Sequence, residues 1–511
     1  MRSNAHGERR ITGSGFLRLG VAALLSVGLP TILPHGAAAE ALPPSPIPQN
    51  PSDVAAVPAF TGSPASPKPV SSPTVPQNAF MAPNGRSNLH DDAYMTNTYL
   101  WAGLLGNNAQ TLSTLQGGEC ASLTFDSSGR IVAICIGLEG PRLVMFDPKT
   151  LDLLAVMTLP PRSLGTNNPF TDFSGGGYFY LDQSDRAVIP TANGQIWVVG
   201  ETSGATGTGF SLQRAYDLSS FMSSGDQIIS ALPDWSGRIW FATTKGVIGT
   251  IDPASGAVKV LNLAEPIGNS FSVDQTGGVF MVTDRALYRF DPAPDGSPLI
   301  SWRETYPNVG SVKPGQTEDG SGTTPNLMGA KYVAITDNAD PMDVVVYRRA
   351  KSISGSRVVC TVPVFSIGSG STDNSLIGTG RSIIVENNYG YTGPLATRNG
   401  AATAPGIERI DINSAGTGCK PVWYSAQSAP SAVPKLSLGA GLVYAYTKPP
   451  RSDGIDAWYL TALSFRTGKT VYEQLAGTGL GYNSNYAPVS LGPDNTAYVG
   501  ALGGLILVRD G

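Results

Sequence analysis

Two short stretches of the chain concentrate oxygen-bearing side chains that could bind a ligand: Asp337–Asp340 (DNAD) and Glu386–Tyr391 (ENNYGY). Carboxylate and amide oxygens suit Ca²⁺, and the two tyrosines could stack on a sugar or another flat ligand. For any single residue the competing interpretation is favoured, because Asp and Asn fill tight turns by hydrogen-bonding to the local backbone. The concentration of both stretches in one part of the chain supports a binding site for the group. No EF-hand spacing accompanies them, so Ca²⁺ is only a candidate ion.

Catalytic constellations are scarce. His90 is the only histidine after residue 35, and it lies at the start of the predicted domain, where a surface or strand-start role is favoured over that of a base. Ser-His-Asp and Cys-His mechanisms are therefore disfavoured. A carboxylate mechanism stays open, because Glu386 with Asp337 or Asp373 could act as acid and base or hold a metal. Binding is favoured over catalysis, and enzymatic activity remains uncertain.

One cycle of apolar strands and tight Asp/Gly turns recurs eight times between Gly118 and Gly511. A sheet of four short strands cannot bury both faces alone, so such units must stack, and this period is typical of a β-propeller. The sequence predicts an all-β, eight-bladed propeller, with seven blades as the alternative. The repeats start near Cys120, Gly176, Ala231, Ser270, Thr324, Asn374, Val433 and Tyr486.

The last repeat supplies only three strands. The segment 97–116 precedes the first full repeat and can provide the missing strand, which would close the ring and remove an exposed sheet edge. A single propeller domain is therefore predicted over residues 89–511, and the protein is expected to be a monomer.

In such a blade, the loop before the innermost strand and the loop joining the second and third strands share one face, around the central channel. This rule gathers polar residues into a candidate ligand-binding set on the channel face. The set comprises Glu119, Asp226, Asn269, Asp337, Asn338, Asp340, Asp373, Asn374, Glu386, Asn387, Asn388, Tyr389, Tyr391, Lys435 and Asn485.

Several turns carry an Asp-Pro-x-Ser/Thr-Gly-like signature, at Phe146-DPKTLDLL, Ile251-DPASGAVKV and, more weakly, Ser464-FRTGKTVY. These resemble the blade units of the quinoprotein-like (PQQ-like) secreted propellers. The resemblance implies the blade plan. It does not extend to the dehydrogenases of that superfamily, because the adjacent paired cysteines over the cofactor and the regular tryptophan-docking repeats are missing here.

Four cysteines, Cys120, Cys135, Cys360 and Cys419, favour disulfides in an exported chain. Cys120 and Cys135 flank a hairpin centred on residues 126–129, and facing residues across that turn have numbers summing to 255, which places this pair opposite one another. Cys360 and Cys419 occupy matching places in consecutive repeats, and their pairing is left open.

The N-terminus has the features of an export signal over residues 1–41: basic residues, the apolar run Leu19–Leu33 and a small-residue cleavage site. Arg9-Arg10 leaves a twin-arginine route open beside the general one. The Pro-rich stretch 42–88 predicts a disordered linker. Net charge is −4, without a Lys/Arg block in the body, so nucleic-acid binding is not expected. No membrane span is expected in the mature chain.

The sequence thus predicts a secreted or periplasmic binding protein that recognises a small polar ligand, a glycan or a protein partner on its channel face. The alternative is an extracellular propeller enzyme, either a metal-dependent hydrolase or lactonase or a quinone-dependent dehydrogenase.

Overall fold

The structure, a computed structural model, describes residues 44–137, 139–162, 170–204 and 207–511. The predicted signal peptide and its cleavage site lie outside the described residues. Those that are described fall in one unit, Pro43–Gly511. Among them, no helix has both the length and the apolar character needed to cross a membrane.

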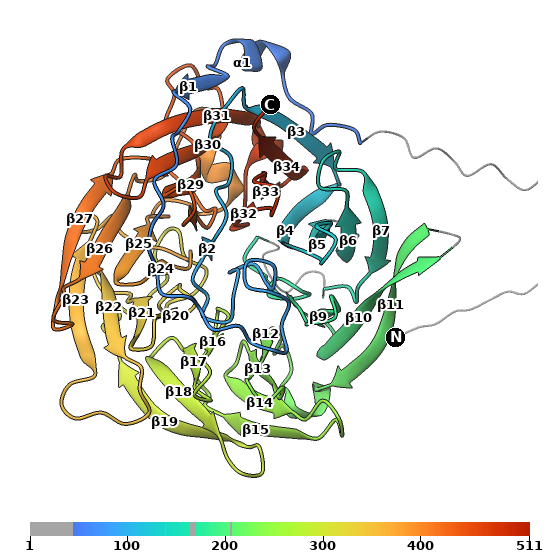
Figure 1. Cartoon of the computed structure of the whole chain (residues 1–511), viewed down its shortest axis with the longest axis vertical. Helices are drawn as coiled ribbons and strands as arrows, with labels where there is room; N and C mark the ends of the chain where they lie inside the picture. Colours follow the sequence, from blue (N-terminus) through green and yellow to red (C-terminus); the bar gives the residue numbers. More distant parts are fainter. Residues whose placement is uncertain (1–43, 138, 163–169, 205–206) are drawn as a thin grey trace, which may run out of the picture. The chain divides into compact units, whose positions relative to one another are not determined.

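Eight sheets formed by the described residues are arranged in a closed ring, as predicted for an eight-bladed propeller, and the strands within each blade pair antiparallel with their neighbours (Figure 1). Sheet 1 consists of β4 (Gly118–Phe125), β5 (Ile131–Gly137), β6 (Gly140–Phe146) and β7 (Leu153–Thr158), and sheet 2 of β8 (Tyr180–Leu181), β9 (Ala187–Pro190), β10 (Gln195–Gly204) and β11 (Gly207–Asp217). Sheet 3 consists of β12 (Ile228–Pro233), β13 (Ile239–Thr243), β14 (Val247–Ile251) and β15 (Val258–Asn262), and sheet 4 of β16 (Ser272–Val273), β17 (Val279–Val282), β18 (Ala286–Pro292) and β19 (Pro298–Thr305).

Sheet 5 consists of β20 (Asn326–Met328), β21 (Tyr332–Thr336), β22 (Met342–Arg348) and β23 (Val358–Val364), and sheet 6 of β24 (Ile377–Thr379), β25 (Ser382–Glu386), β26 (Ile407–Ile412) and β27 (Cys419–Ser425). Sheet 7 consists of β28 (Lys435–Ser437), β29 (Leu442–Thr447), β30 (Ala457–Ser464) and β31 (Thr470–Thr478), flanked by β1 (Phe60–Gly62) and β2 (Thr98–Tyr99). Sheet 8 consists of β32 (Val489–Leu491), β33 (Ala497–Ala501) and β34 (Gly504–Arg509) together with β3 (Gln110–Leu115). Short helical turns are α1 (Pro51–Ala55), η1 (Ser219–Phe221), η2 (Pro394–Thr397) and η3 (Leu480–Tyr482).

The repeated Asp/Gly turns have a common local cause. The Asp126 carboxylate accepts hydrogen bonds from the backbone N–H groups of Ser128 and Arg130, at 2.9 and 2.8 Å. The same pair of bonds recurs at Asp182, Asp234 and Asp274. Such Asx turns satisfy donors that strand pairing leaves free. They join the innermost strand to the second strand of the sheet.

The ring closes as predicted. β3, which lies inside the predicted segment 97–116, pairs antiparallel with β34 and becomes the outermost strand of the last sheet. The two ends of the described propeller chain are thereby joined in one sheet, and the edge that the three C-terminal strands would expose is covered.

A disulfide joins Cys120 to Cys135, with Cα atoms 3.8 Å apart, as predicted. Strand partners near the turn sum to 256 rather than 255, because the turn spans Asp126–Arg130. A β-bulge between Glu119 and Ser122 restores the sum of 255 at the far end of the hairpin. The predicted pairing of the cysteines is therefore confirmed, whereas the predicted register is off by one residue from Ser122 to Phe125, and Cys120 itself lies in the bulge.

The second disulfide joins Cys360 on β23 to Cys419 on β27, with Cα atoms 5.8 Å apart. These are the outermost strands of adjacent sheets, so the bond links sheets 5 and 6 at the rim of the ring. The described residues include no free cysteine. Two disulfides fit a protein that matures in an oxidising compartment.

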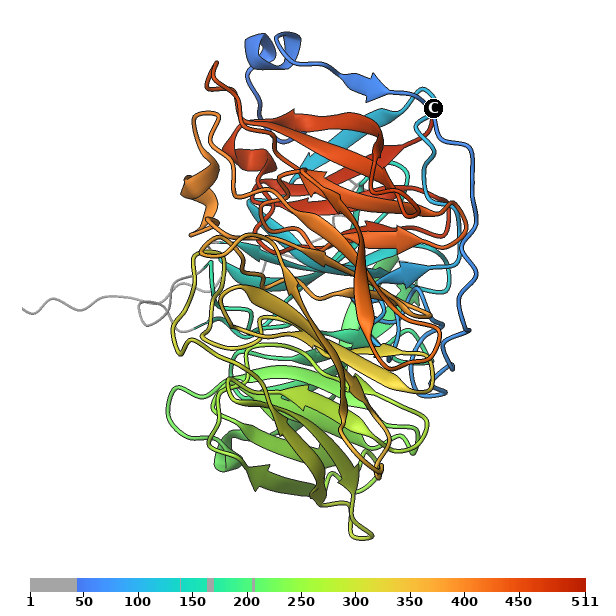
Figure 2. The same ribbon diagram turned by 90° about the vertical axis from the view of Figure 1, so that its left-hand side faces the viewer.

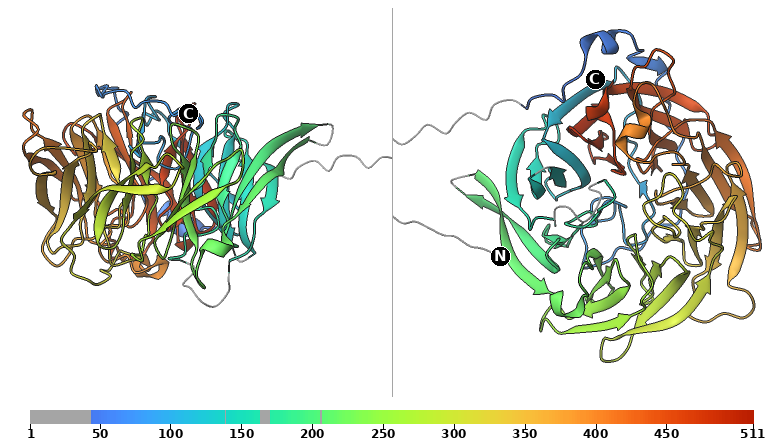
Figure 3. Two further views of the ribbon diagram at one scale, coloured as in Figure 1. Left: turned by 90° about the horizontal axis from the view of Figure 1, so that it is seen from below. Right: turned by 180° about the vertical axis from the view of Figure 1, so that it is seen from behind.

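The Pro-rich segment departs from the sequence expectation. The sequence predicts a disordered linker over 42–88, but residues 44–88 run along the ring in contact with it (Figures 2 and 3). Ser45 O accepts from Leu115 N, β1 pairs with β31, and Lys68 N donates to Ala440 O at 2.8 Å. Proline favours extended backbone and has no N–H to donate to a neighbouring strand, so a Pro-rich segment cannot form a sheet by itself. Such a segment is ordered only by contacts with other parts of the protein.

Residues 88–99, here called the channel segment, enter the centre of the ring. The segment bonds to the innermost strands of five sheets: Asn88 pairs with Tyr180, Ala93 O accepts from Val273 N, Tyr94 O from Leu327 N, Thr96 O from Gly378 N, and Asn97 O from Leu436 N. β2 then pairs parallel with β28. His90, for which the sequence favours a surface or strand-start role, is instead 2% exposed inside the channel.

Candidate functional site

The two polar stretches predicted to form a site are brought together by a third segment, the loop 306–325 between β19 and β20. Val309 N donates to Asn338 O at 3.0 Å, in the first stretch. Pro314 O accepts from Gly390 N at 3.2 Å, in the second. All three segments lie on the end of the ring from which the innermost strands start, here called the loop face. The sequence placed both stretches on this face but did not reveal that a loop covers them.

The first stretch serves the loops that hold it. Asp337 and Asn338 are fully buried, and Asp337 accepts from Ala339 N and Asp343 N. The Asn338 amide donates to Asn308 Oδ1 and to two backbone carbonyls of loop 306–325. Both side chains thus follow the turn-filling interpretation, and neither is displayed on the surface.

The second stretch is also mostly internal. Glu386 ends β25 at 1% exposure, and its Oε1 accepts from the amides of Asn374 and Asn388 at 2.5 and 3.2 Å. Burial raises the pKa of the Glu386 carboxyl well above its ordinary value. Asn387 accepts from Ser371 N and donates to backbone carbonyls. The sequence treats Glu386 as an open-loop ligand residue, whereas it lies inside the packed sheet end.

A hollow of about 320 Å³ opens on the loop face beside these stretches. It is lined by Phe170, Thr171, Val312, Lys313, Pro314, Gly315, Gln316, Tyr391, Thr392, Gly393 and Tyr486. Tyr391 is the candidate residue of the sequence-based set that reaches it. The Tyr391 hydroxyl donates to Asn483 Oδ1 at 3.0 Å and lies 3.2 Å from Asn485 Oδ1, which fixes the ring in place.

Tyr486 is held in an unusual backbone conformation at the hollow. Its φ is 66°, in the left-handed region, where a bulky residue is an outlier. Its ring packs edge-on against Tyr391 at 5.4 Å and against Phe173 at 5.7 Å, between ring centroids. Strained residues of this kind persist only where surrounding structure imposes them, and they cluster at binding and catalytic sites.

Carboxyl groups with raised pKa values contact or belong to the segments that line the hollow. Gln316 lines it, and the next residue, Thr317, donates from N and Oγ1 to Asp373 Oδ2 at 2.8 and 2.6 Å. Burial raises the pKa of Asp373 to about 7, and burial with the nearby Asp373 charge raises that of Glu318 to about 8. Glu119 accepts from Asn485 N at 2.6 Å, and burial raises its pKa to about 8.

The remaining candidate residues have separate local roles. Asp226 accepts from Thr243 Oγ1, Thr244 Oγ1 and Lys245 N in the β13–β14 turn. Asn269 accepts from the Tyr178 hydroxyl at 3.1 Å. Asp340 accepts from Gly368 N, and Tyr389 donates its N–H to Asn387 Oδ1. Lys435 belongs to the buried contact with the channel segment.

Sequence reasoning missed Lys313, Gln316, Glu318 and Tyr486 as parts of the site. Three of them come from loop 306–325, whose length exceeds that of most connections in compact domains, and long ordered loops of this kind are often functional. The length of this loop was the feature of the sequence that could have indicated a role in the site. Tyr486 was recognised only as the start of a repeat.

No group of three or more His, Cys, Asp or Glu side chains within the described ranges is arranged to hold a metal ion. Glu119, Asp226, Asn269, Asp373 and Glu386 would be the first residues to test as ligands on chemistry alone, yet each of these side chains already accepts a hydrogen bond from another protein group. The Ca²⁺ hypothesis therefore gains no geometric support.

Fold and hollow together define an eight-bladed β-propeller with a tyrosine-lined cavity on its loop face. No family model matches the chain. An uncharacterized protein of Archaeoglobus fulgidus is 30% identical over 317 residues, 55% of this chain and 61% of the archaeal one. The chain therefore spans less than two thirds of that relative.

Three solved structures resemble the chain with low identity. They are the computationally designed Ika8 protein (12% identity, 77% of this chain and 96% of that one, TM-score 0.46), BamB from Moraxella catarrhalis (12%, 88% and 98%, 0.44) and a streptogramin B lyase (11%, 79% and 98%, 0.34). Likeness at this level carries no argument about activity.

Proposed function

We propose that the protein is an exported β-propeller binding protein whose loop-face hollow takes a small polar ligand of the sugar class. The observation that carries the proposal is the hollow itself, about 320 Å³ in volume, whose wall includes the half-buried Tyr486 ring packed against the buried Tyr391 ring. That volume lies at the lower end of the range of small-molecule sites. A protein partner would need a far larger contact area than this hollow provides.

The lining supports a neutral, hydroxyl-rich ligand. The half-buried Tyr486 ring offers an apolar face on which a sugar ring can pack. The Gln316 amide is engaged within its own loop, because its Oε1 accepts from Lys313 N and its Nε2 donates to Gly320 O. The Lys313 ammonium is already engaged, because it donates to the carbonyl oxygens of Ala339 and Gly370. An anionic ligand would therefore compete with existing bonds for this charge.

Export to a secreted or periplasmic location is part of the same proposal, and it rests on the signal-like residues 1–41 and on the two disulfides. Membership of the PQQ-like superfamily is likewise proposed from the blade signatures alone.

Replacing Tyr486 with glycine should weaken binding at least about tenfold, because the ring that walls the hollow is lost. Stability should not fall greatly, since glycine adopts a φ of 66° without strain. Titration calorimetry against a panel of mono- and disaccharides measures the affinity, with Tyr424→Ala, half exposed on β27, as the matched control. Equal affinity in Tyr486→Gly would place the ligand elsewhere. Failure of every sugar to bind wild type would refute the ligand class.

A hydrolase is the second candidate, favoured by the raised pKa values of Glu318, two residues after the lining residue Gln316, and of Asp373, which accepts from Thr317. A carboxyl that keeps its proton near pH 7 can act as a general acid. If the protein cleaves a bound disaccharide, Glu318→Gln should lower kcat by about 100-fold or more while leaving the Kd of the sugar nearly unchanged. Product analysis by chromatography checks this, and a wild-type protein that binds disaccharides without cleaving any is a binding protein.

A further inference from the structure

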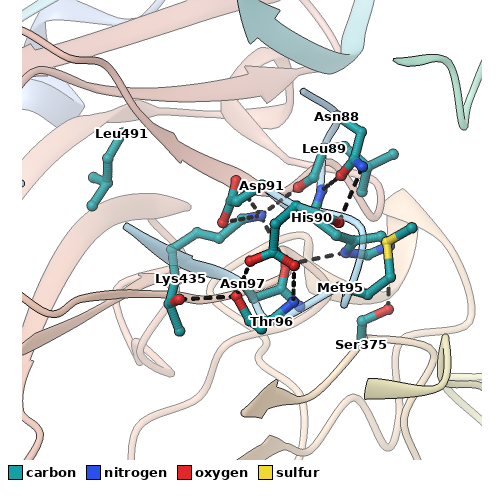
Figure 4. Close-up of polar contacts among 12 residues, drawn as sticks. Asn88, Leu89, His90, Asp91, Met95, Thr96, Asn97, Ser375, Lys435 and Leu491 are labelled. Carbon is teal, nitrogen blue, oxygen red and sulfur yellow. Dashed lines mark hydrogen bonds and ion pairs between the residues drawn. The ribbon is translucent and has the colours of Figure 1, made fainter. Parts of the chain in front are cut away.

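The channel segment meets the first residue of β28, Lys435, in a cluster closed to water (Figure 4). The side chains of Lys435 and Asp91 are 0% and 1% exposed, and Lys435 Nζ lies 3.2 Å from both carboxyl oxygens of Asp91. The same Nζ donates to Asn97 Oδ1 at 2.8 Å and to Leu89 O. The Tyr99 ring covers the ammonium, 5.8 Å from its centroid.

The Asn97 amide is polarised from a second side. Its Oδ1 also lies 3.0 Å from His90 Nδ1, and its Nδ2 donates to Leu376 O at 2.8 Å. Burial is the main cause that lowers the pKa of His90 to about 3, so the ring is neutral. His90 Nε2 faces the Thr324 and Ser375 hydroxyls, which can donate to it. The ring proton therefore lies on Nδ1, aimed at Asn97 Oδ1.

Amine, amide carbon and carboxyl are within reacting range. Because the carbonyl bond is about 1.2 Å long, the Lys435 Nζ to Asn97 Cγ distance is at most about 4 Å. Near-attack conformers bring reacting atoms to about 3–3.5 Å, so a small shift suffices. The left-handed φ of 56° at Asn97 holds its side chain toward β28. Such a φ is accessible to asparagine.

The charge states suit a nucleophilic amine. Burial lowers the pKa of the Lys435 amine and raises that of the Asp91 carboxyl to about 7, and each change favours the neutral form of the group. A neutral amine has a free electron pair, and a protonated carboxyl can deliver a proton to a leaving group.

We propose that Lys435 and Asn97 form an intramolecular isopeptide bond that ties the channel segment to sheet 7. The Nζ electron pair attacks Cγ of Asn97, and the carbonyl electrons move to Oδ1, which the His90 Nδ1–H stabilises. Asp91 delivers its proton to Nδ2 and takes one from Nζ. The Cγ–Nδ2 bond breaks, the carbonyl reforms and ammonia leaves, so the Nζ–Cγ amide is produced with Asp91 again protonated and without any oxidant or co-reactant.

The bond would lock a segment that otherwise depends on hydrogen bonds to strands of five sheets. It would join a residue that precedes the first blade to one more than 300 positions later in the chain. The cluster lies away from the loop-face hollow, so the inference stands independently of the proposed ligand.

The test is the intact mass of the purified, fully reduced protein. Loss of one ammonia makes it about 17 Da lighter than the sequence mass, and proteolysis followed by tandem mass spectrometry should recover one branched peptide joining Asn97 to Lys435. An intact mass equal to the sequence mass of the mature chain overturns the proposal. A 17 Da loss that maps to any other residue overturns it as well.

Asp91→Asn is the variant that isolates the chemistry, because it keeps both bond partners and removes the carboxyl that moves protons. We expect this variant to carry the full, unmodified mass. Lys435→Met gives the same mass readout if it folds, and Lys448→Met, at another buried lysine that bonds to Ala401 O, is the matched control that keeps the 17 Da loss. Full modification of Asp91→Asn would contradict the role given to Asp91.

Discussion

Replacing Arg349 with methionine is expected to lower the free energy of unfolding by about 3–5 kcal/mol, because it leaves the Asp274 carboxylate buried without its partner. The two side chains are 2% and 1% exposed and form an ion pair. Arg349 also donates to the Tyr94 hydroxyl at 2.8 Å and to Gly329 O at 2.9 Å. One guanidinium thus holds together the turn of sheet 4, sheet 5 and the channel segment.

Urea unfolding followed by tryptophan fluorescence measures this loss. Lys259→Met is the matched control, because the side chains of its ion pair with Asp295, at 3.7 Å, are 48% and 60% exposed and lie at the surface. Surface pairs contribute about 0–1 kcal/mol, so the control should stay close to wild type. A loss below about 1 kcal/mol in Arg349→Met would mean that Asp274 finds water or another donor when the arginine is absent.

The blade plan was predictable because its causes are local. Sheets 1 to 4 are each marked by an Asp that caps the turn after the innermost strand, as Asp126 and Asp234 do, and such turns carry a glycine such as Gly237 with a φ of 84°. Strand alternation and turn chemistry act within a few residues of one another, so one sequence reveals them. The Cys120–Cys135 pairing was predictable for the same reason.

The channel segment and the loop-face cover were not predictable, because their partners are remote in sequence. Composition says that a Pro-rich stretch cannot build its own core, and this holds for residues 44–88. It does not reveal that Asn78 Nδ2 donates to Pro233 O at 2.8 Å or that Asp91 meets Lys435. Lys435 was predicted in the loop before an innermost strand, whereas it is the buried first residue of β28 and its partner Asp91 comes from a segment assigned to no blade.

The candidate site shows the same division. Position in the blade placed Asp337 and Glu386 on the loop face, yet both side chains are buried and hydrogen-bonded to residues of the same sheet end. Whether a polar residue is exposed on this face depends on how the long loops fold over one another, and the position of a residue within its blade does not predict that. Tyr391 is the predicted residue that lines the hollow.

The stability of the protein is expected to fall as the pH rises from about 5 to about 8, and Glu119 is the residue that shows why most directly. Glu119 is 8% exposed, and burial raises the pKa of its carboxyl from 4.5 to about 8. Between those two pH values the folded protein keeps this proton while the unfolded chain releases it. The folded state then binds more protons, so the free energy of unfolding decreases with pH across this window.

Glu119→Gln removes this titration and keeps an oxygen that can accept from Asn485 N. The variant should match wild type near pH 5 and be more stable near pH 8, on the order of a few kcal/mol, since each pH unit in which only the folded state is protonated contributes about 1.4 kcal/mol.

His90, whose pKa is lowered to about 3, adds stability that is lost as pH falls below 6.5, but it is present in both proteins and cancels in the comparison. Asp295→Asn is the control, because the pKa of that exposed carboxyl is lowered from 3.8 and it is ionised in both states above pH 5. Urea unfolding at pH 5, 6.5 and 8 measures the slopes. Parallel slopes for wild type and Glu119→Gln would show that Glu119 is ionised in the folded protein throughout this range, held so by the Asn485 N–H and the charge of Arg162.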